Sequence, residues 1–160
     1  MSTIKRLTET DRPSLRQFWK EHWGGDSMVV HGQVYTTDQL DGFVTIEDNT
    51  WLGLVTFLVE GNACEIISLD SLREGLGIGT ALIKAVEKEA RKLGCARLVV
   101  VTTNDNTHAL RFYQKRGFQL TTLRRLAVNE SRKLKPGIPL TGDDGIPIRD
   151  ELELELRLDG

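Results

Sequence analysis

Three glycines at alternate positions precede an apolar helical pattern in the segment LREGLGIGTAL, residues 72–82. Gly75, Gly77 and Gly79 would let backbone N–H groups approach an oxyanion, and the positive end of the following helix dipole would strengthen the attraction. The G-x-G-x-x-G and Walker A motifs do not fit, because the third glycine is one residue early and no lysine follows Gly79. A tight strand-to-helix turn would also use glycine, so anion binding is the favoured of two interpretations.

A tyrosine lies on a second helical pattern, THALRFYQKRGF, residues 107–118. Asn106 and Thr107 are residue types that cap helices. Ala109, Phe112 and Tyr113 share one face of this helix at i, i+3 and i+4. Capping and packing explain these residues by themselves, and a core position is the favoured interpretation of Tyr113. A buried tyrosine hydroxyl needs a hydrogen-bond partner, however, and a reacting group would supply one.

The candidate general base is Glu65, which lies on an apolar strand pattern over residues 63–72. Partial burial among isoleucines and leucines would raise the pKa of its carboxyl toward the range that suits a base at neutral pH. A strand residue of this type also commonly faces solvent, and the residues do not decide between these two interpretations. Asp70, near the end of the same strand, is the alternative base.

The elements that must position these groups alternate along the chain. A short strand opens the sequence, and a helix capped by Asp11 with Pro13 in its first turn follows. Residues 24–39 show no clear pattern. Three strands over residues 40–48, 49–60 and 63–72 are joined by turns too short for crossovers, so we predict an antiparallel meander.

Beyond the glycines the hydrophobic period becomes helical and then alternates between strand and helix. A helix is predicted from Ile78 to Leu93, a strand over 96–103, a helix stopped at Gly117, and a strand over 118–128, an order that favours parallel pairing. Residues 129–150 are predicted to be a long loop insertion. The last strand, ELELELRL, carries its leucines on one face, and the glutamates of its other face are expected to be solvated.

Two of these segments resemble one family. LREGLGIGTAL resembles the central motif of the GNAT superfamily of acyl-CoA-dependent N-acyltransferases, Gln/Arg-x-x-Gly-x-Gly/Ala, with Gly77 and Gly79 at its small positions. Glu74 stands where the family has Gln or Arg, and Arg73 could supply that charge. DNTHALRFYQKRGF is similar to the family pattern Asn-x-x-Ala-x-x-Phe-Tyr-x-x-x-Gly-Phe. That second pattern aligns with Asn106, Ala109, Phe112, Tyr113, Gly117 and Phe118.

The resemblance implies an α/β (α+β) fold with a single domain over residues 1–160. Its sheet would be mixed, mostly antiparallel and twisted, with a central splayed parallel pair and helices on both faces. The implied function is an N-acetyltransferase that moves an acetyl group from acetyl-CoA to a primary amine by direct attack in a ternary complex. The alternative is a non-catalytic CoA-binding or regulatory partner-binding module on the same fold.

The resemblance also implies roles for individual residues. Tyr113 would protonate the leaving thiolate, Glu65 would act as the base, and the strand near Leu69 would provide a backbone donor for the carbonyl oxygen. His31 and Tyr35 lie in the segment that usually borders the acceptor, so they and Glu65 are the substrate candidates. The implied cofactor-binding residues are Leu69, Ser71, Arg73, Gly75, Leu76, Gly77, Ile78, Gly79, Thr80, Asn106, Phe112 and Tyr113.

Composition limits the remaining function classes. The 160 residues carry a formal net charge of −2, which gives no general attraction to nucleic acid or to an anionic membrane. There is no apolar run long enough to span a bilayer and no signal-peptide core, so a cytoplasmic location is expected. Cys64 and Cys95 are predicted to be buried free thiols, and no metal site is expected. Family members commonly pair through the last strand, so a homodimer is a further expectation.

Overall fold

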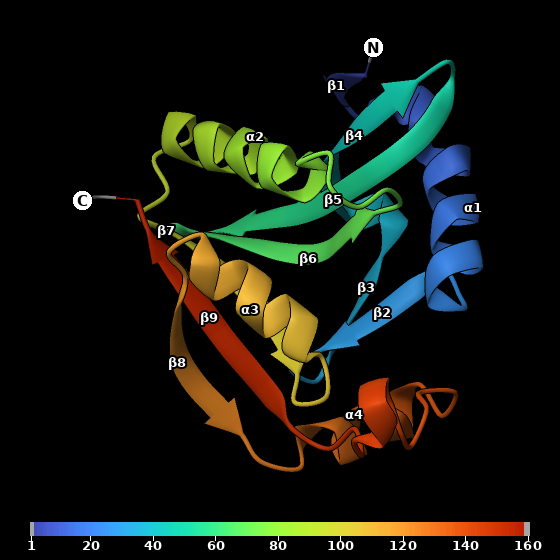
Figure 1. Cartoon of the computed structure of the whole chain (residues 1–160), viewed down its shortest axis with the longest axis vertical. Coiled ribbons are helices and arrows are strands. Elements are labelled where there is room, and N and C mark those ends of the chain that lie inside the picture. The colour runs from blue at the N-terminus through green and yellow to red at the C-terminus, as the bar shows by residue number, and fades with distance from the viewer. Residues whose placement is uncertain (1, 159–160) are drawn as a thin grey trace.

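A computed structural model describes residues 2–158, and a seven-stranded sheet forms its centre (Figure 1). The strand order is β1-β4-β5-β6-β7-β9-β8, and a separate two-stranded sheet pairs β2 with β3. Within the described residues no helix is long and apolar enough to cross a membrane. The strands are β1 Thr3–Arg6, β2 Ser27–Val30, β3 Gln33–Thr36, β4 Asp41–Glu47, β5 Thr50–Glu60, β6 Ala63–Ser71, β7 Arg97–Thr103, β8 Gln119–Arg124 and β9 Glu151–Arg157; the helices are α1 Arg12–Trp23, α2 Ile78–Lys92, α3 Thr107–Lys115 and α4 Ala127–Leu134.

Two hydrophobic cores cover the two faces of the sheet. One core packs α2 and α3 against the sheet and includes the fully buried side chains of Leu82, Leu98 and Leu154. The other packs α1 and the β2–β3 hairpin against the opposite face, around the fully buried Trp19. The prediction of helices on both faces of a mixed sheet is therefore confirmed, and the alternation of apolar residues along the strands is its cause.

The central strands β6 and β7 form the parallel pair, and they separate at one end. Their pairing runs from Ala63 with Arg97 to Ile66 with Val100, although β6 continues to Ser71 and β7 to Thr103. A β-bulge in the β5–β6 ladder, between Thr56 and Phe57, lies at the same level. Because a bulge bends and twists its strand, it helps to lead β6 away from β7. The predicted splayed pair is confirmed.

The order of the last strands differs from the simple alternation of strand and helix. Of the two strand–helix–strand crossovers, only the first, from β6 through α2 to β7, joins strands that lie side by side and parallel. Strand β9 lies between β7 and β8 and is antiparallel to both. The leucine face of β9 packs in the core beneath α2 and α3 through Leu154 and Leu156, and Leu158 follows just after the strand.

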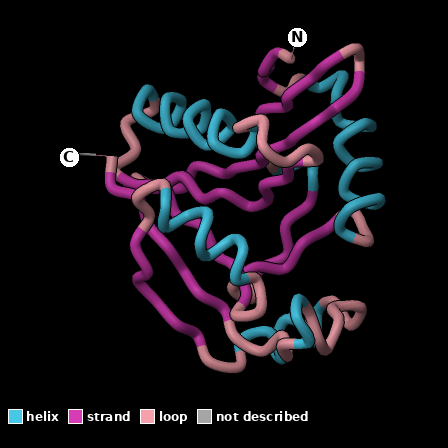
Figure 2. Tube along the Cα trace, viewed as in Figure 1, coloured by secondary structure: helices cyan, strands magenta, loops and turns pink. Residues whose placement is uncertain are grey.

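Two segments hold more structure than the sequence pattern indicated. Residues 27–36 form the β2–β3 hairpin, and the predicted loop over 129–150 begins inside helix α4, because the buried Val128 and Ser131 give this segment a packed face. Arg132 then holds the rest of the insertion, donating to the carbonyl oxygens of Pro139 and Ile148 at 2.7 Å each. Figure 2 shows α4 and its loops at the opposite end of the molecule from α2.

Both cysteines are free and buried, as predicted. Cys64 is fully buried in the core under α2, and this burial raises the pKa of its thiol to about 12. The thiol is therefore protonated at neutral pH and acts as a small apolar side chain.

Candidate active site

A large cavity lies where β6 and β7 separate, at the N-terminal ends of α2 and α3. Its volume is about 670 Å³. Eleven of the twelve residues predicted to bind the cofactor line it; the exception is Leu76, whose side chain is 61% exposed. Whether they bind a cofactor stays a prediction. The complete lining is Trp23, Leu69, Asp70, Ser71, Arg73, Glu74, Gly75, Gly77, Ile78, Gly79, Thr80, Asn106, His108, Ala109, Phe112, Tyr113 and Arg116.

Two of the three glycines are required by backbone conformation. Gly75 has φ 77° and Gly77 has φ 69°, which is the left-handed region that side chains disfavour. A Cβ atom at either position would meet nothing within 4 Å, so the space around them is open. Gly77 is also the N-cap of α2, where backbone N–H groups lack helical partners. In this turn, residues with positive φ alternate with a residue with negative φ just before a helix begins. Such a backbone geometry directs N–H groups toward one point and binds anions.

The third glycine has a different role. Gly79 lies inside α2, and a Cβ atom there would approach the Phe112 ring of α3 to 3.0 Å. The absence of a side chain at Gly79 therefore lets α2 and α3 pack closely beside the cavity. The sequence interpretation grouped all three glycines as one anion-binding device, whereas the structure separates this packing position from the two turn positions.

Replacing Gly79 with valine is expected to lower the free energy of unfolding by about 1–3 kcal/mol, because the added methyl groups overlap the Phe112 ring. Thermal unfolding of the purified variant measures the change. Gly137→Val is the matched control, because a Cβ atom at Gly137 meets nothing within 4 Å and its backbone is not left-handed. Equal losses in the two variants would contradict the packing role of Gly79.

Arg116 is the cation that the sequence analysis missed. Its Nε donates to the Thr80 hydroxyl at 2.8 Å, and its guanidinium lies 3.8 Å from the centre of the Phe112 ring. These contacts hold a fixed positive charge on the cavity wall. The signal was present, because Arg116 follows Phe112 by four residues and so lies on the same helix face. Arg73, the predicted cation, also lines the cavity and pairs with Glu47 at 3.3 Å.

Tyr113 lies at the inner end of the same cavity. The side chain is 6% exposed, and its ring packs edge-on against Phe112 and Phe118. Burial, together with the negative charge of Asp70, raises the pKa of its hydroxyl above the usual value of 10.0, so the group stays protonated at neutral pH. Asn106 caps α3 by accepting the Ala109 N–H at 3.0 Å. The capping interpretation of Asn106 is thus correct, and a ligand contact is an additional prediction.

Asp70, the alternative base, lies in the same cavity rather than beside Glu65. Burial raises the pKa of its carboxyl, and a hydrogen bond from Trp23 opposes this rise. The Trp23 Nε1 atom donates to Asp70 Oδ2 at 3.1 Å. Trp23 is the last residue of α1, so this bond connects α1 with the end of β6 beside Tyr113.

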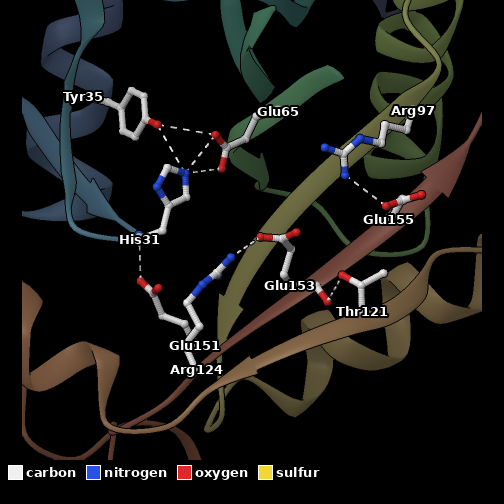
Figure 3. Close-up of polar contacts among 9 residues, drawn as sticks. All are labelled: His31, Tyr35, Glu65, Arg97, Thr121, Arg124, Glu151, Glu153 and Glu155. Atoms are coloured by element: carbon white, nitrogen blue, oxygen red, sulfur yellow. Dashed lines mark hydrogen bonds and ion pairs between the residues drawn. The ribbon is translucent and has the colours of Figure 1, made fainter. Parts of the chain in front are cut away.

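The predicted substrate residues meet on the opposite face of the sheet. His31 Nε2 lies 2.8 Å from Glu65 Oε2 and 3.0 Å from Glu65 Oε1, and the Tyr35 hydroxyl donates to Glu65 Oε1 at 3.4 Å (Figure 3). The hydrogen bond that His31 donates to the Glu65 carboxylate is the main cause that raises the pKa of the His31 imidazole above 6.5, while burial opposes it. Glu65 and the protonated His31 are therefore coupled as an ion pair.

His31 owes its position to a tight turn. His31 and Gly32 have φ 40° and 79°, the positive values that a two-residue type I′ turn between β2 and β3 requires. The backbone N–H of His31 donates to Glu151 Oε2 at 3.0 Å, which anchors the tip of the hairpin to β9. The sequence analysis found no element here, because asparagine-glycine is the usual signal for such a turn and histidine replaces the asparagine.

The acidic face of β9 is not the solvated face that the sequence analysis expected. Glu151 is only 3% exposed, Glu153 Oε1 lies 2.5 Å from Arg124, and Glu155 Oε2 lies 3.0 Å from Arg97. The β2–β3 hairpin covers the end of this face through His31, which explains the burial of Glu151. A hollow of about 260 Å³ lies beside the pair of His31 and Glu65. It is lined by His31, Glu60, Ala63, Glu65, Arg97, Val99 and Glu153.

Comparisons with known proteins agree with this geometry. The model of the Acetyltransferase (GNAT) family matches residues 4–118. The uncharacterized proteins YxbD and YdhI of Bacillus subtilis (strain 168) are 50% and 43% identical, over 86% and 95% of this chain and 87% and 96% of their own lengths. The crystal structure of a GNAT family acetyltransferase from Elizabethkingia anophelis with acetyl-CoA bound superimposes with a TM-score of 0.71 at 23% identity, covering 98% of each chain. The chain belongs to the GNAT acetyltransferase family.

Proposed function

We propose that the protein is an N-acetyltransferase that transfers the acetyl group of acetyl-CoA to a primary amine by direct attack in a ternary complex. The observation that carries this proposal is the placement of two sites along one strand. Leu69 and Asp70 of β6 line the large cavity, and Glu65 of the same strand lines the hollow on the other side. The splay between β6 and β7 begins past Ile66, between these two positions of the strand, and would let the acetyl group reach the acceptor.

The large cavity suits the diphosphate and pantetheine of coenzyme A. The left-handed Gly75 and Gly77 present backbone N–H groups at the start of α2, and Arg116, bonded to Thr80 in the first turn of α2, adds a positive charge to the lining. Beyond Ile66, β6 has no strand partner on the side of β7 in the described residues, so its backbone groups are available to an extended arm. Bound there, acetyl-CoA supplies an acetyl thioester as the activated acyl group.

The pair of His31 and Glu65 is proposed to remove the proton from the acceptor. An alkyl ammonium has a pKa of about 10.4 and cannot attack until it is neutral. The nitrogen then bonds to the acetyl carbon as the carbon–sulfur bond breaks, and the products are an amide, a thiol and one proton. The coupled pair holds that proton, since the carboxylate of Glu65 raises the pKa of His31.

Tyr113 is proposed to assist the departing sulfur. Its pKa is raised, so the hydroxyl is a hydrogen-bond donor at neutral pH. A thiolate with a pKa near 8.5 carries the negative charge more readily than this phenol does. The tyrosine therefore stabilises the sulfur first through an O–H···S contact, and the proton transfer completes as the products separate.

Calorimetric titration with acetyl-CoA tests the proposed function. The expected result is one binding site with micromolar affinity, together with release of free thiol when primary amines are added. Absence of binding at high micromolar acetyl-CoA would reject the proposal. Binding without thiol release from any amine would instead favour a non-catalytic CoA-binding module, for which Glu74 in place of Gln or Arg is the supporting feature.

A further inference from the structure

The β2–β3 hairpin carries His31 but stands apart from the main sheet. Within the described residues its two strands pair with each other and with no strand of the seven-stranded sheet. An isolated two-stranded hairpin is marginally stable at best, so contacts outside its own ladder must fix it. Its strands are fixed by Lys135, whose Nζ donates to the Ser27 oxygen at 2.8 Å, and by Met28 and Tyr35, which pack in the core under α1.

The tip of the hairpin is held separately, by Glu151 of β9. The His31 N–H donates to Glu151 Oε2 at 3.0 Å, while the imidazole of the same residue lies 2.8 Å from Glu65 Oε2 (Figure 3). His31 is thus held by β9 through its backbone and by β6 through its side chain. Its φ of 40° is a conformation that a residue with a side chain keeps only where its surroundings enforce it.

Glu151 is itself fixed in the sheet. It is 3% exposed, and it is paired directly with Thr103 of β7 on one side and with Arg124 of β8 on the other. Arg124 supplies the opposite charge on this cross-strand pair, which compensates the buried carboxylate. Glu151 belongs to the lining of neither cavity. Its carboxylate therefore acts on the protein and not on a bound molecule.

On the basis of the proposed transferase function, we infer that Glu151 is a positioning residue for the reaction, which fixes the backbone of His31 and so keeps the imidazole beside Glu65. Without this anchor the tip of the hairpin is free to move, and the pair that receives the proton of the acceptor loses its geometry. A misplacement of about 1 Å can lower a rate about 100-fold even when the substitution lies away from the reacting atoms.

Two variants of Glu151 separate the anchor from the charge. Glu151→Gln keeps an amide oxygen that can accept the His31 N–H, whereas Glu151→Ala removes the acceptor. Both variants take the opposite charge away from Arg124, so a difference between them reports the anchor. Glu151→Ala is expected to lose about 10- to 100-fold in kcat for a primary amine with the affinity for acetyl-CoA within twofold, and Glu151→Gln to keep most of the native kcat. Thiol release and calorimetry measure both quantities, with Glu130→Ala on the exposed face of α4 as the control.

A second measurement needs no reaction. His31 is one of three histidines, and its imidazole signal is the one lost in His31→Asn, so an NMR titration follows its pKa directly. The bond to Glu65 is the largest cause that raises this pKa, and the charge of Glu151 is the smallest. The pKa is therefore expected to fall slightly in Glu151→Gln and to approach 6.5 in Glu151→Ala, where the contact with Glu65 is lost. The other ionisable groups around the imidazole are unchanged in both variants; they are Tyr35, Glu60, Arg97 and Glu153.

Equal kcat and equal His31 pKa in Glu151→Gln and Glu151→Ala would overturn the inference. If the alanine variant does not fold, Glu151→Asp replaces it, because aspartate keeps the charge but is one methylene too short to reach the His31 N–H. The same loss of kcat is expected there, and a native kcat in Glu151→Asp would overturn the inference. A fall of the pKa in a protein that releases no thiol with any amine would support the anchor and reject the transferase function.

Discussion

A Glu65→Gln variant is expected to lose about 100- to 1,000-fold in kcat for a primary amine, while its affinity for acetyl-CoA stays within twofold. The reason is that general-base catalysis contributes a factor of this size, and glutamine cannot bind the proton. Glu65 lines the hollow and not the large cavity, so the loss should appear in turnover and not in cofactor binding. Steady-state thiol release and calorimetry measure the two effects separately.

The pH profile of the same variant distinguishes the proton-binding pair from a merely structural role. Because the pKa of His31 lies above 6.5 in the native protein, the acidic limb of kcat/KM is expected above pH 6.5. Removal of the Glu65 charge removes the main cause of that rise and leaves burial, which lowers the pKa. The limb should therefore move to lower pH. Glu87→Gln, which breaks a surface pair with Arg91, is the control, and an unmoved limb in Glu65→Gln would exclude the pair as the base.

Replacing Tyr113 with phenylalanine is expected to lower kcat about 100-fold with little change in the dissociation constant of acetyl-CoA. The phenyl ring keeps the edge-on contacts with Phe112 and Phe118, so only the hydroxyl is lost. The loss is confined to the step in which negative charge develops on sulfur, and removal of one donor to such a charge has an effect of this order. Single-turnover thiol release and calorimetry give the two quantities.

The control for Tyr113→Phe is a second acetyl donor whose thiol is a better leaving group than coenzyme A. An acetyl thioester of an acidic aryl thiol needs less help at the sulfur, so the difference between variant and native protein should shrink with it. A difference that stays at 100-fold with both thioesters would show that the hydroxyl does not act on the sulfur. A native rate in the variant with acetyl-CoA would remove Tyr113 from the mechanism.

The sequence predicted those parts of the fold that follow from hydrophobic periodicity and from the positions of glycines. The alternation in residues 40–72 gave the antiparallel meander, and the two motifs located the large cavity with every proposed lining residue except Leu76. Local patterns decide these elements because strands pair with their neighbours and one helix face packs inward.

The features that the sequence did not predict depend on contacts between segments that are far apart in the chain. Glu151 is buried because the tip of the β2–β3 hairpin, 120 residues away, donates to it, and no local pattern distinguishes it from the solvated glutamates of an ordinary edge strand. Arg132 similarly orders the insertion through carbonyl oxygens up to sixteen residues further along the chain. The alternation of strand and helix could not show that β9 inserts between β7 and β8, because that order depends on pairing between segments far apart in the sequence.

The hairpin of β2 and β3 is a separate two-stranded sheet that contacts Glu65 on the proposed acceptor side through His31 and Tyr35, and it contributes no residue to the lining of the large cavity. In the proposed function, the hairpin would thus contribute to acceptor binding alone, whereas β6 contributes residues to both sites. Substitutions within residues 27–36 are therefore expected to change the proposed acceptor side and to leave the lining of the large cavity unchanged. In a fold with this arrangement, the choice of acceptor could change through a few substitutions in one hairpin.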